Sequence, residues 1–172
     1  MIDVAVGAPH LGATEHVTAL FESECERLLG FFVRRVELRE DAADLVAETA
    51  LTLWRRAGDV PLDPEQARMW LYGVARRVLS THRRGGARRS ALADRLRDEL
   101  AVEPPPHPHE GTVEWVRAAV ESLPPRDREL VTLVHWDGFS LAQAATILRL
   151  RDGTARMRYR RARIRLRALL SE

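Results

Sequence analysis

Residues 140–170 read SLAQAATILRLRDGTARMRYRRARIRLRALL, and this segment has the pattern of two short helices joined by a tight turn. Ser140 and Gln143 have the spacing of a capping box, in which each side chain satisfies the other residue's backbone amide at a helix start. An eight-residue apolar helix, Leu141–Leu148, is followed by a three-residue turn. Asp152 then caps a longer basic helix that runs from Gly153 to about Leu170. The pattern predicts a helix-turn-helix.

The second of these helices is too rich in arginine to be a buried helix. Residues 149–172 hold nine arginines and two acids, and Met157, Ile164 and Leu166 are the apolar side chains expected to pack. The first turn of such a helix enters the DNA major groove, so Thr154 and Arg156 are candidates for reading bases. Later arginines are better placed for phosphates. A plain helical hairpin with a solvated basic face is the alternative.

The rest of the chain also predicts helices and contains no alternating strand pattern. Apolar spacings of three and four predict a helix over 15–36 after Thr14 and another over 41–57 that Gly58 ends. A third helix begins after an Asp63 cap and runs to about Arg84, where Gly85 and Gly86 are expected to end it. A weaker helix covers 90–100, and two more cover about 112–122 and 125–136. The fold class is therefore all-α.

The segment VEPPPHPHEGT, residues 102–112, is too rich in proline to be helical and predicts a semi-rigid linker. It divides the chain into an N-terminal helical domain, 14–101, a linker, 102–111, and a C-terminal helix-turn-helix domain, 112–172. His107 and His109 have no further ligand nearby in the sequence, so we interpret them as linker residues rather than a metal site.

The composition limits the classes of function that the chain can have. The 172 residues carry a formal net charge of +2, all 27 basic residues are arginine, and a second basic cluster, 76–89, holds six arginines and no acid. Such clusters in a nearly neutral chain favour a polyanionic partner. Cys25 is the only cysteine, and the sequence has no apolar run of membrane-spanning length. We expect a cytoplasmic protein that is not an enzyme, because no clustered catalytic carboxylates, nucleophile elbow or phosphate loop is present.

Two N-terminal helices carry further candidate residues. In the third helix, arginines recur at helical spacing near Trp70 and Tyr72, a combination suited to unstacked bases of single-stranded DNA. The alternative is that both aromatic side chains belong to the core. In the second helix, Asp41, Asp44 and Glu48 lie near the N-terminus, where acids also stabilise the helix dipole without any partner.

Three blocks of the sequence carry a combined signal: DAADLVAETALTLWRR (41–56), ARMWLYGVARRVLSTHRR (67–84) and ESLPPRDRELVTLVHWDGFSLAQAATILRLRDGTARMRYRRARIRLRALL (121–170). Together they resemble the extracytoplasmic-function sigma factors of bacterial RNA polymerase. The resemblance implies that the first block docks on core polymerase, the second melts and reads the minus-ten promoter element, and the third reads the minus-35 element. It implies core RNA polymerase and promoter DNA as partners, and no metal, cofactor or catalytic residue. It also allows an anti-sigma factor.

The resemblance assigns candidate residues to each role. The polymerase-binding candidates are Asp41, Asp44, Leu45, Glu48, Thr49 and Trp54. The minus-ten candidates are Trp70, Tyr72, Arg76, Arg77, Ser80, Thr81, Arg83 and Arg84. The minus-35 candidates are Ser140, Gln143, Gly153, Thr154, Arg156, Met157, Arg158, Arg160, Arg161 and Arg163. A stand-alone helix-turn-helix regulator that does not engage polymerase is the alternative, followed by a helical interaction protein with no role at DNA.

Overall fold

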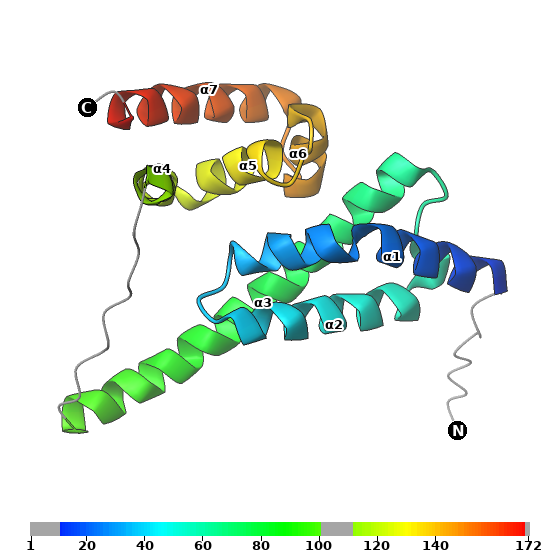
Figure 1. The fold of residues 1–172 in the computed structure, drawn as a ribbon, viewed down its shortest axis with the longest axis horizontal. Coiled ribbons are helices and arrows are strands. Elements are labelled where there is room, and N and C mark those ends of the chain that lie inside the picture. Colours follow the sequence, from blue (N-terminus) through cyan, green and yellow to red (C-terminus); the bar gives the residue numbers. More distant parts are fainter. Residues whose placement is uncertain (1–10, 101–111, 171–172) are drawn as a thin grey trace. The chain divides into compact units, whose positions relative to one another are not determined.

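A computed structural model describes residues 11–100 and 112–170, and throughout these residues the regular structure is helical (Figure 1). The elements in chain order are α1 (Leu11–Val33), α2 (Arg39–Arg55), the 3-10 turn η1 (Ala57–Asp59), α3 (Pro64–Leu100), α4 (Thr112–Glu121), α5 (Pro125–His135), α6 (Leu141–Leu148) and α7 (Asp152–Leu169). The all-α prediction is confirmed. The chain divides into two compact units, Met1–Gly86 and Ala87–Glu172. The predicted linker, 102–111, lies outside the described residues.

The first unit is built on α1 and α2, which lie side by side, with α3 crossing them (Figure 1). Its core is rich in aromatic side chains: the ring of Phe31 meets Phe32 edge-on at 5.2 Å and Tyr72 edge-on at 5.4 Å. Leu28 and Leu53 are fully buried beside other apolar residues of the three helices. Burial of each such side chain contributes about 1.5–3 kcal/mol, which is the main reason that these helices associate.

A buried carboxylate joins α1 to α3 within this core. Glu24 is only 5% exposed. Its Oε2 accepts hydrogen bonds from Arg68 Nε at 3.1 Å and from the Tyr72 hydroxyl at 3.2 Å, and its Oε1 accepts one from Arg27 at 3.1 Å. A buried charge is tolerated when it is paired and hydrogen-bonded in this way.

In the second unit α7 packs on α5 and α6 through small and aromatic side chains. Leu123, Val131 and Ala162 form a buried cluster, against which Tyr159 and Leu166 pack. Met157 and Ile164, which the sequence predicts to pack, are instead 55% and 60% exposed. The reason is geometric: alanines at 155 and 162, spaced by seven residues, occupy the buried face of α7 and leave Met157 and Ile164 on the other side.

The start signals at Asp63 and Ser140 are confirmed, whereas several predicted helix limits are wrong. The predicted Asp152 cap is also wrong: Arg151 is the N-cap of α7 and makes no side-chain cap hydrogen bond, and Asp152 is the first residue of the helix. Asp63 Oδ1 accepts the backbone amide of Gln66 at 2.9 Å, as the cap at the start of α3 requires. However, α1 begins at Leu11 rather than after Thr14, α2 ends at Arg55, and α3 continues through Gly85 and Gly86 to Leu100. Each glycine costs a helix only about 1 kcal/mol relative to alanine, which does not oblige the helix to end.

Candidate functional site

The outer side of α2 presents an exposed stripe of three charged residues and one leucine. Asp44, Glu48, Leu51 and Arg55 are all exposed and recur at spacings of four, three and four residues, so they lie along one line of the helix. We call these four residues the docking face. The prediction from sequence included the two acids but missed Leu51, which is 59% exposed. The sequence signal that could have identified Leu51 was its position outside the line of buried residues on α2, such as Leu45, Thr49 and Leu53.

Two residues predicted to bind polymerase belong to the core instead. Leu45 is 2% exposed and Thr49 is fully buried, and the Thr49 hydroxyl donates to the Leu45 carbonyl oxygen at 2.7 Å. Both lie on the side of α2 that packs in the first unit, so neither side chain is available to a partner. Trp54 is half-buried and packs on Phe21, with ring centroids 5.3 Å apart. These residues support the docking face without forming it.

Asp41 lies at the start of α2 and contacts α3. Its carboxylate is 3.4 Å from His82 Nε2, and both side chains are partly buried. A second contact follows directly along α3, where Arg83 donates to the carbonyl oxygen of Arg35 at 2.9 Å. These two contacts fix the N-terminal end of α2, and the connection that precedes it, to the third helix.

The basic segment of α3, residues 76–84, carries most of the predicted minus-ten residues on its accessible sides. Arg77, Ser80, Thr81, Arg83 and Arg84 are exposed, and Arg76 is half-buried. Arg84 donates to the Thr81 hydroxyl at 3.2 Å, so these two side chains lie together on the surface. The segment therefore offers several cationic and hydroxyl groups to an anionic partner.

The two aromatic candidates of α3 have different environments. Tyr72 is fully buried, and its hydroxyl donates to Glu24, so the prediction that its ring stacks on a base is wrong. Its position on the same side as Leu71 and Ala75 places it in the core. Trp70 is half-buried, and the guanidinium of Arg56 lies over its ring at 5.3 Å. Trp70 is thus the accessible aromatic ring of the pair.

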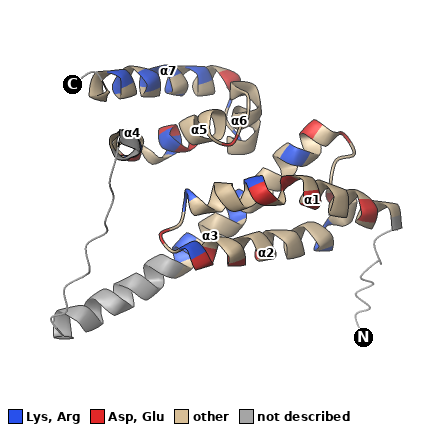
Figure 2. Cartoon of the chain, viewed as in Figure 1, with Lys and Arg blue, Asp and Glu red and all other residues tan. Residues whose placement is uncertain are grey.

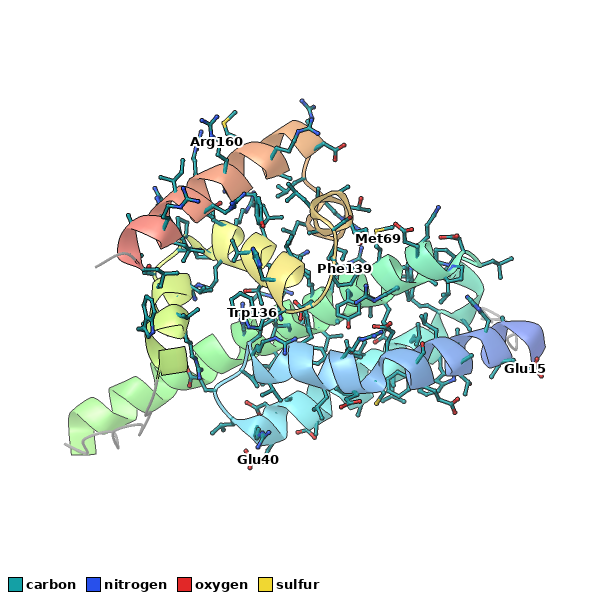
Figure 3. The ribbon with its side chains drawn as sticks, turned by 45° about the horizontal axis from the view of Figure 1, so that its top comes forward. Glu15, Glu40, Met69, Trp136, Phe139 and Arg160 are labelled. Carbon is teal, nitrogen blue, oxygen red and sulfur yellow. The ribbon has the colours of Figure 1, made fainter. Side chains whose placement is uncertain are left out.

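In the second unit, α7 presents arginines along its solvent-facing sides (Figure 2). The labelled Arg160 projects from the side of α7 that faces away from α5 (Figure 3). The exposed members of the predicted minus-35 set on this helix are Gly153, Thr154, Arg156, Met157, Arg160, Arg161 and Arg163. A helix of this kind can enter a major groove, since its outer surface is not covered by the rest of the unit.

Arg158 joins α7 to α5 through an ion pair. Its Nη1 donates to Asp127 Oδ1 on α5 at 2.8 Å, and the two side chains are 32% and 8% exposed. Its contact with the minus-35 element stays a prediction, for a guanidinium that this ion pair already engages. The partner of Arg158 lies 31 residues earlier in the chain, so no local pattern could identify the pair.

The turn between α6 and α7 has the geometry that the sequence predicts. The capping box is complete: Ser140 Oγ accepts from the Gln143 amide at 3.2 Å, and Gln143 Oε1 accepts from the Ser140 amide at 2.7 Å. Arg149 ends α6 in the left-handed region, at φ 53° and ψ 44°. The turn thus keeps helix-turn-helix geometry with an arginine where glycine is easier.

Within the described residues, no helix has the length and apolar character needed to cross a membrane.

Comparison with known proteins gives a consistent result. Residues 20–89 match the family model described as Sigma-70 region 2, and residues 113–166 match the one described as Sigma-70, region 4. The chain is 33% identical over 139 residues to the ECF RNA polymerase sigma factor SigF of Caulobacter vibrioides, covering 79% of this chain and 75% of the relative. It is 28% identical over 163 residues to SigL of Mycobacterium tuberculosis, covering 90% and 88%.

Solved structures agree on the fold. The chain is similar to the sigma factor RpoE of Bartonella quintana, solved with the anti-sigma factor NepR, at a TM-score of 0.64 and 23% identity, covering 91% of this chain and 95% of that one. It is equally similar to CnrH, solved with the cytosolic domain of CnrY, at a TM-score of 0.64 and 23% identity, covering 92% and 94%.

Proposed function

Because this chain belongs to the ECF sigma factors of bacterial RNA polymerase, initiation factors that act with core polymerase at promoters, we propose a role for each of its three exposed surfaces. The docking face of α2 binds core polymerase, the basic segment of α3 opens and reads the minus-ten element, and α7 reads the minus-35 element. The proposal is carried by one observation: α2, α3 and α7 each present exposed side chains to solvent, while other residues of the same helix are buried and hold it in the core.

The overall role is tested by run-off transcription with purified core polymerase and genomic promoter fragments. We expect specific transcripts that depend on both the chain and the core enzyme. A stand-alone regulator is not favoured, because the two matched regions are those of a sigma factor. Tight promoter binding without polymerase, and no transcript with it, would contradict the proposal.

Docking is proposed to use Asp44 and Glu48, which are exposed and lie outside the buried stripe of α2. The double variant Asp44→Ala with Glu48→Ala should weaken core binding while the melting temperature stays within about 3 °C, because exposed substitutions change stability by at most about 0.5 kcal/mol each. Glu22→Ala with Glu26→Ala is the matched control, since it removes two exposed acids from α1. Equal core affinity of both double variants would rule out this face.

In the proposed reading of the promoter by α7, arginines early and late in the helix have different roles. Arg156 lies in the first turns, where a bidentate contact to guanine is worth about 1–3 kcal/mol of discrimination. Arg163 lies about two turns later, where a phosphate contact contributes roughly one unit to the slope of log affinity against log salt for any sequence. In holoenzyme binding to single-base promoter variants, Arg156→Ala should relax preference at one or two positions, and Arg163→Ala should weaken all variants alike. An equal loss on every variant for Arg156→Ala would contradict base reading.

The finer sequence-based expectations form part of the same proposal. The domain limits are 14–101 and 112–172, the protein acts in the cytoplasm, and it has no catalytic activity of its own. An anti-sigma factor is a further proposed partner. It is supported by the two solved structures of similar fold, one with an anti-sigma factor and one with the cytosolic domain of CnrY.

The domain limits are tested by limited proteolysis, which should cut first between Val102 and Thr112. First cuts within 41–84 would contradict these domain limits.

A further inference from the structure

The outermost line of α7 is not purely basic. The buried side of this helix is defined by Ala155 and Ala162, with relative exposures of 1% and 0%. Met157 lies about 200° around the helix from Ala155, and Ile164 lies about 180° around it. Met157 is 55% exposed and Ile164 is 60% exposed, so two large apolar side chains occupy the centre of the face that points away from the core.

The surroundings of Met157 distinguish it from an isolated exposed apolar residue. Arg156 and Arg160 are exposed beside it, and Arg161 Nη2 donates to its sulfur at 3.0 Å. This contact places a guanidinium directly beside the thioether. Met157 is also in the first two turns of α7, where side chains of a recognition helix meet base edges.

The chemistry of the major groove offers one apolar group to such a side chain. Thymine presents a C5-methyl group there, and apolar contact with this methyl distinguishes thymine from the other bases. A thioether is polarizable and flexible, so it can follow the position of a methyl group closely. Arginine and threonine in the same turns can read hydrogen-bonding groups, whereas Met157 has only weak hydrogen-bonding capacity.

We propose that Met157 is a specificity-determining residue that reads the C5-methyl group of one thymine in the minus-35 element. The inference rests on the proposed function of α7 as the minus-35 reader. Ile164 has a similar exposure but lies roughly 10 Å further along the helix, beyond the turns that meet base edges. It therefore provides a matched apolar control on the same face.

The test first selects minus-35 sequences from a random library with holoenzyme formed by the full chain. Each thymine of the selected element is then replaced singly by deoxyuridine, which removes only the methyl group. At one position this replacement should weaken binding by about fourfold, the loss expected for one buried methyl group. Met157→Ala should bind the thymine and uracil elements equally, while Met157→Leu and Ile164→Ala should keep the fourfold difference.

The possible failures are distinguishable. Three outcomes would overturn the reading of thymine by Met157 while leaving α7 as the minus-35 reader. They are a selected minus-35 element without thymine, no effect of uracil at any position, and a fourfold difference that is retained in Met157→Ala. The proposal would also be overturned if Ile164→Ala lost the difference between thymine and uracil as well, because that difference would then not depend specifically on Met157. Selection of no minus-35 sequence at all would overturn the proposed function of α7 and this inference with it.

Discussion

Replacing Arg158 by alanine removes the ion pair that joins α7 to α5. The Arg158 guanidinium lies 2.8 Å from Asp127, whose side chain is only 8% exposed, while that of Arg158 is 32% exposed. Truncating one partner of a fully buried pair costs about 3–5 kcal/mol, and an exposed pair is worth about 0–1 kcal/mol. Since one partner here is buried and the other is partly solvated, we expect Arg158→Ala to cost about 2 kcal/mol.

Hydrogen exchange of the full chain, read by mass spectrometry, isolates this effect from the first unit. A loss of about 2 kcal/mol corresponds to roughly thirtyfold lower protection of the α5 and α7 amides, with the α1 and α2 amides unchanged. Arg160→Ala is the matched control, because it removes an exposed arginine from the same helix and should change stability by at most about 0.5 kcal/mol.

A double-mutant cycle tests whether the loss comes from the pair itself. Asp127→Ala should be costly in the natural chain and cost at least about 1 kcal/mol less when Arg158 is already alanine, because contacting residues are coupled. Asp127 also lies in the first turn of α5, so its favourable interaction with the helix dipole persists in both backgrounds. Additive single effects, or equal protection in Arg158→Ala and Arg160→Ala, would refute a role for the pair in holding the two helices.

Three further outcomes follow from the described contacts. Glu24→Gln should destabilise the first unit by about 1–3 kcal/mol in urea unfolding, because it removes the charge from a buried carboxylate that accepts several hydrogen bonds; unchanged stability would contradict the structural role of this network. Arg149→Gly should raise stability by up to about 1 kcal/mol, since it relieves a left-handed conformation, and a loss would show that the arginine side chain contributes there. Trp70→Ala should slow promoter opening in a fluorescence assay while Tyr72→Phe leaves it unchanged, and the reverse order would contradict their burial.

The features that sequence predicts correctly are those set by neighbouring residues. The all-α class, the reciprocal cap of Ser140 and Gln143, and the Asp63 cap depend on groups within a few positions, where the backbone allows few geometries. The helix limit at Gly85 is wrong, because a glycine is a weak local penalty that a continuing helix tolerates.

Tertiary packing decided which candidate residues are available to partners. Helical spacing gives the side of a helix on which a residue lies, but burial of Thr49 and Tyr72 depends on what packs against that side. Tyr72 meets Glu24 across 48 residues of sequence, and Arg158 meets Asp127 across 31, so both roles arise from contacts that no local pattern contains. The exposure of Met157 has the same origin: the alanines of α7 pack closely enough on their neighbours to bury one face, and this places the methionine on the other.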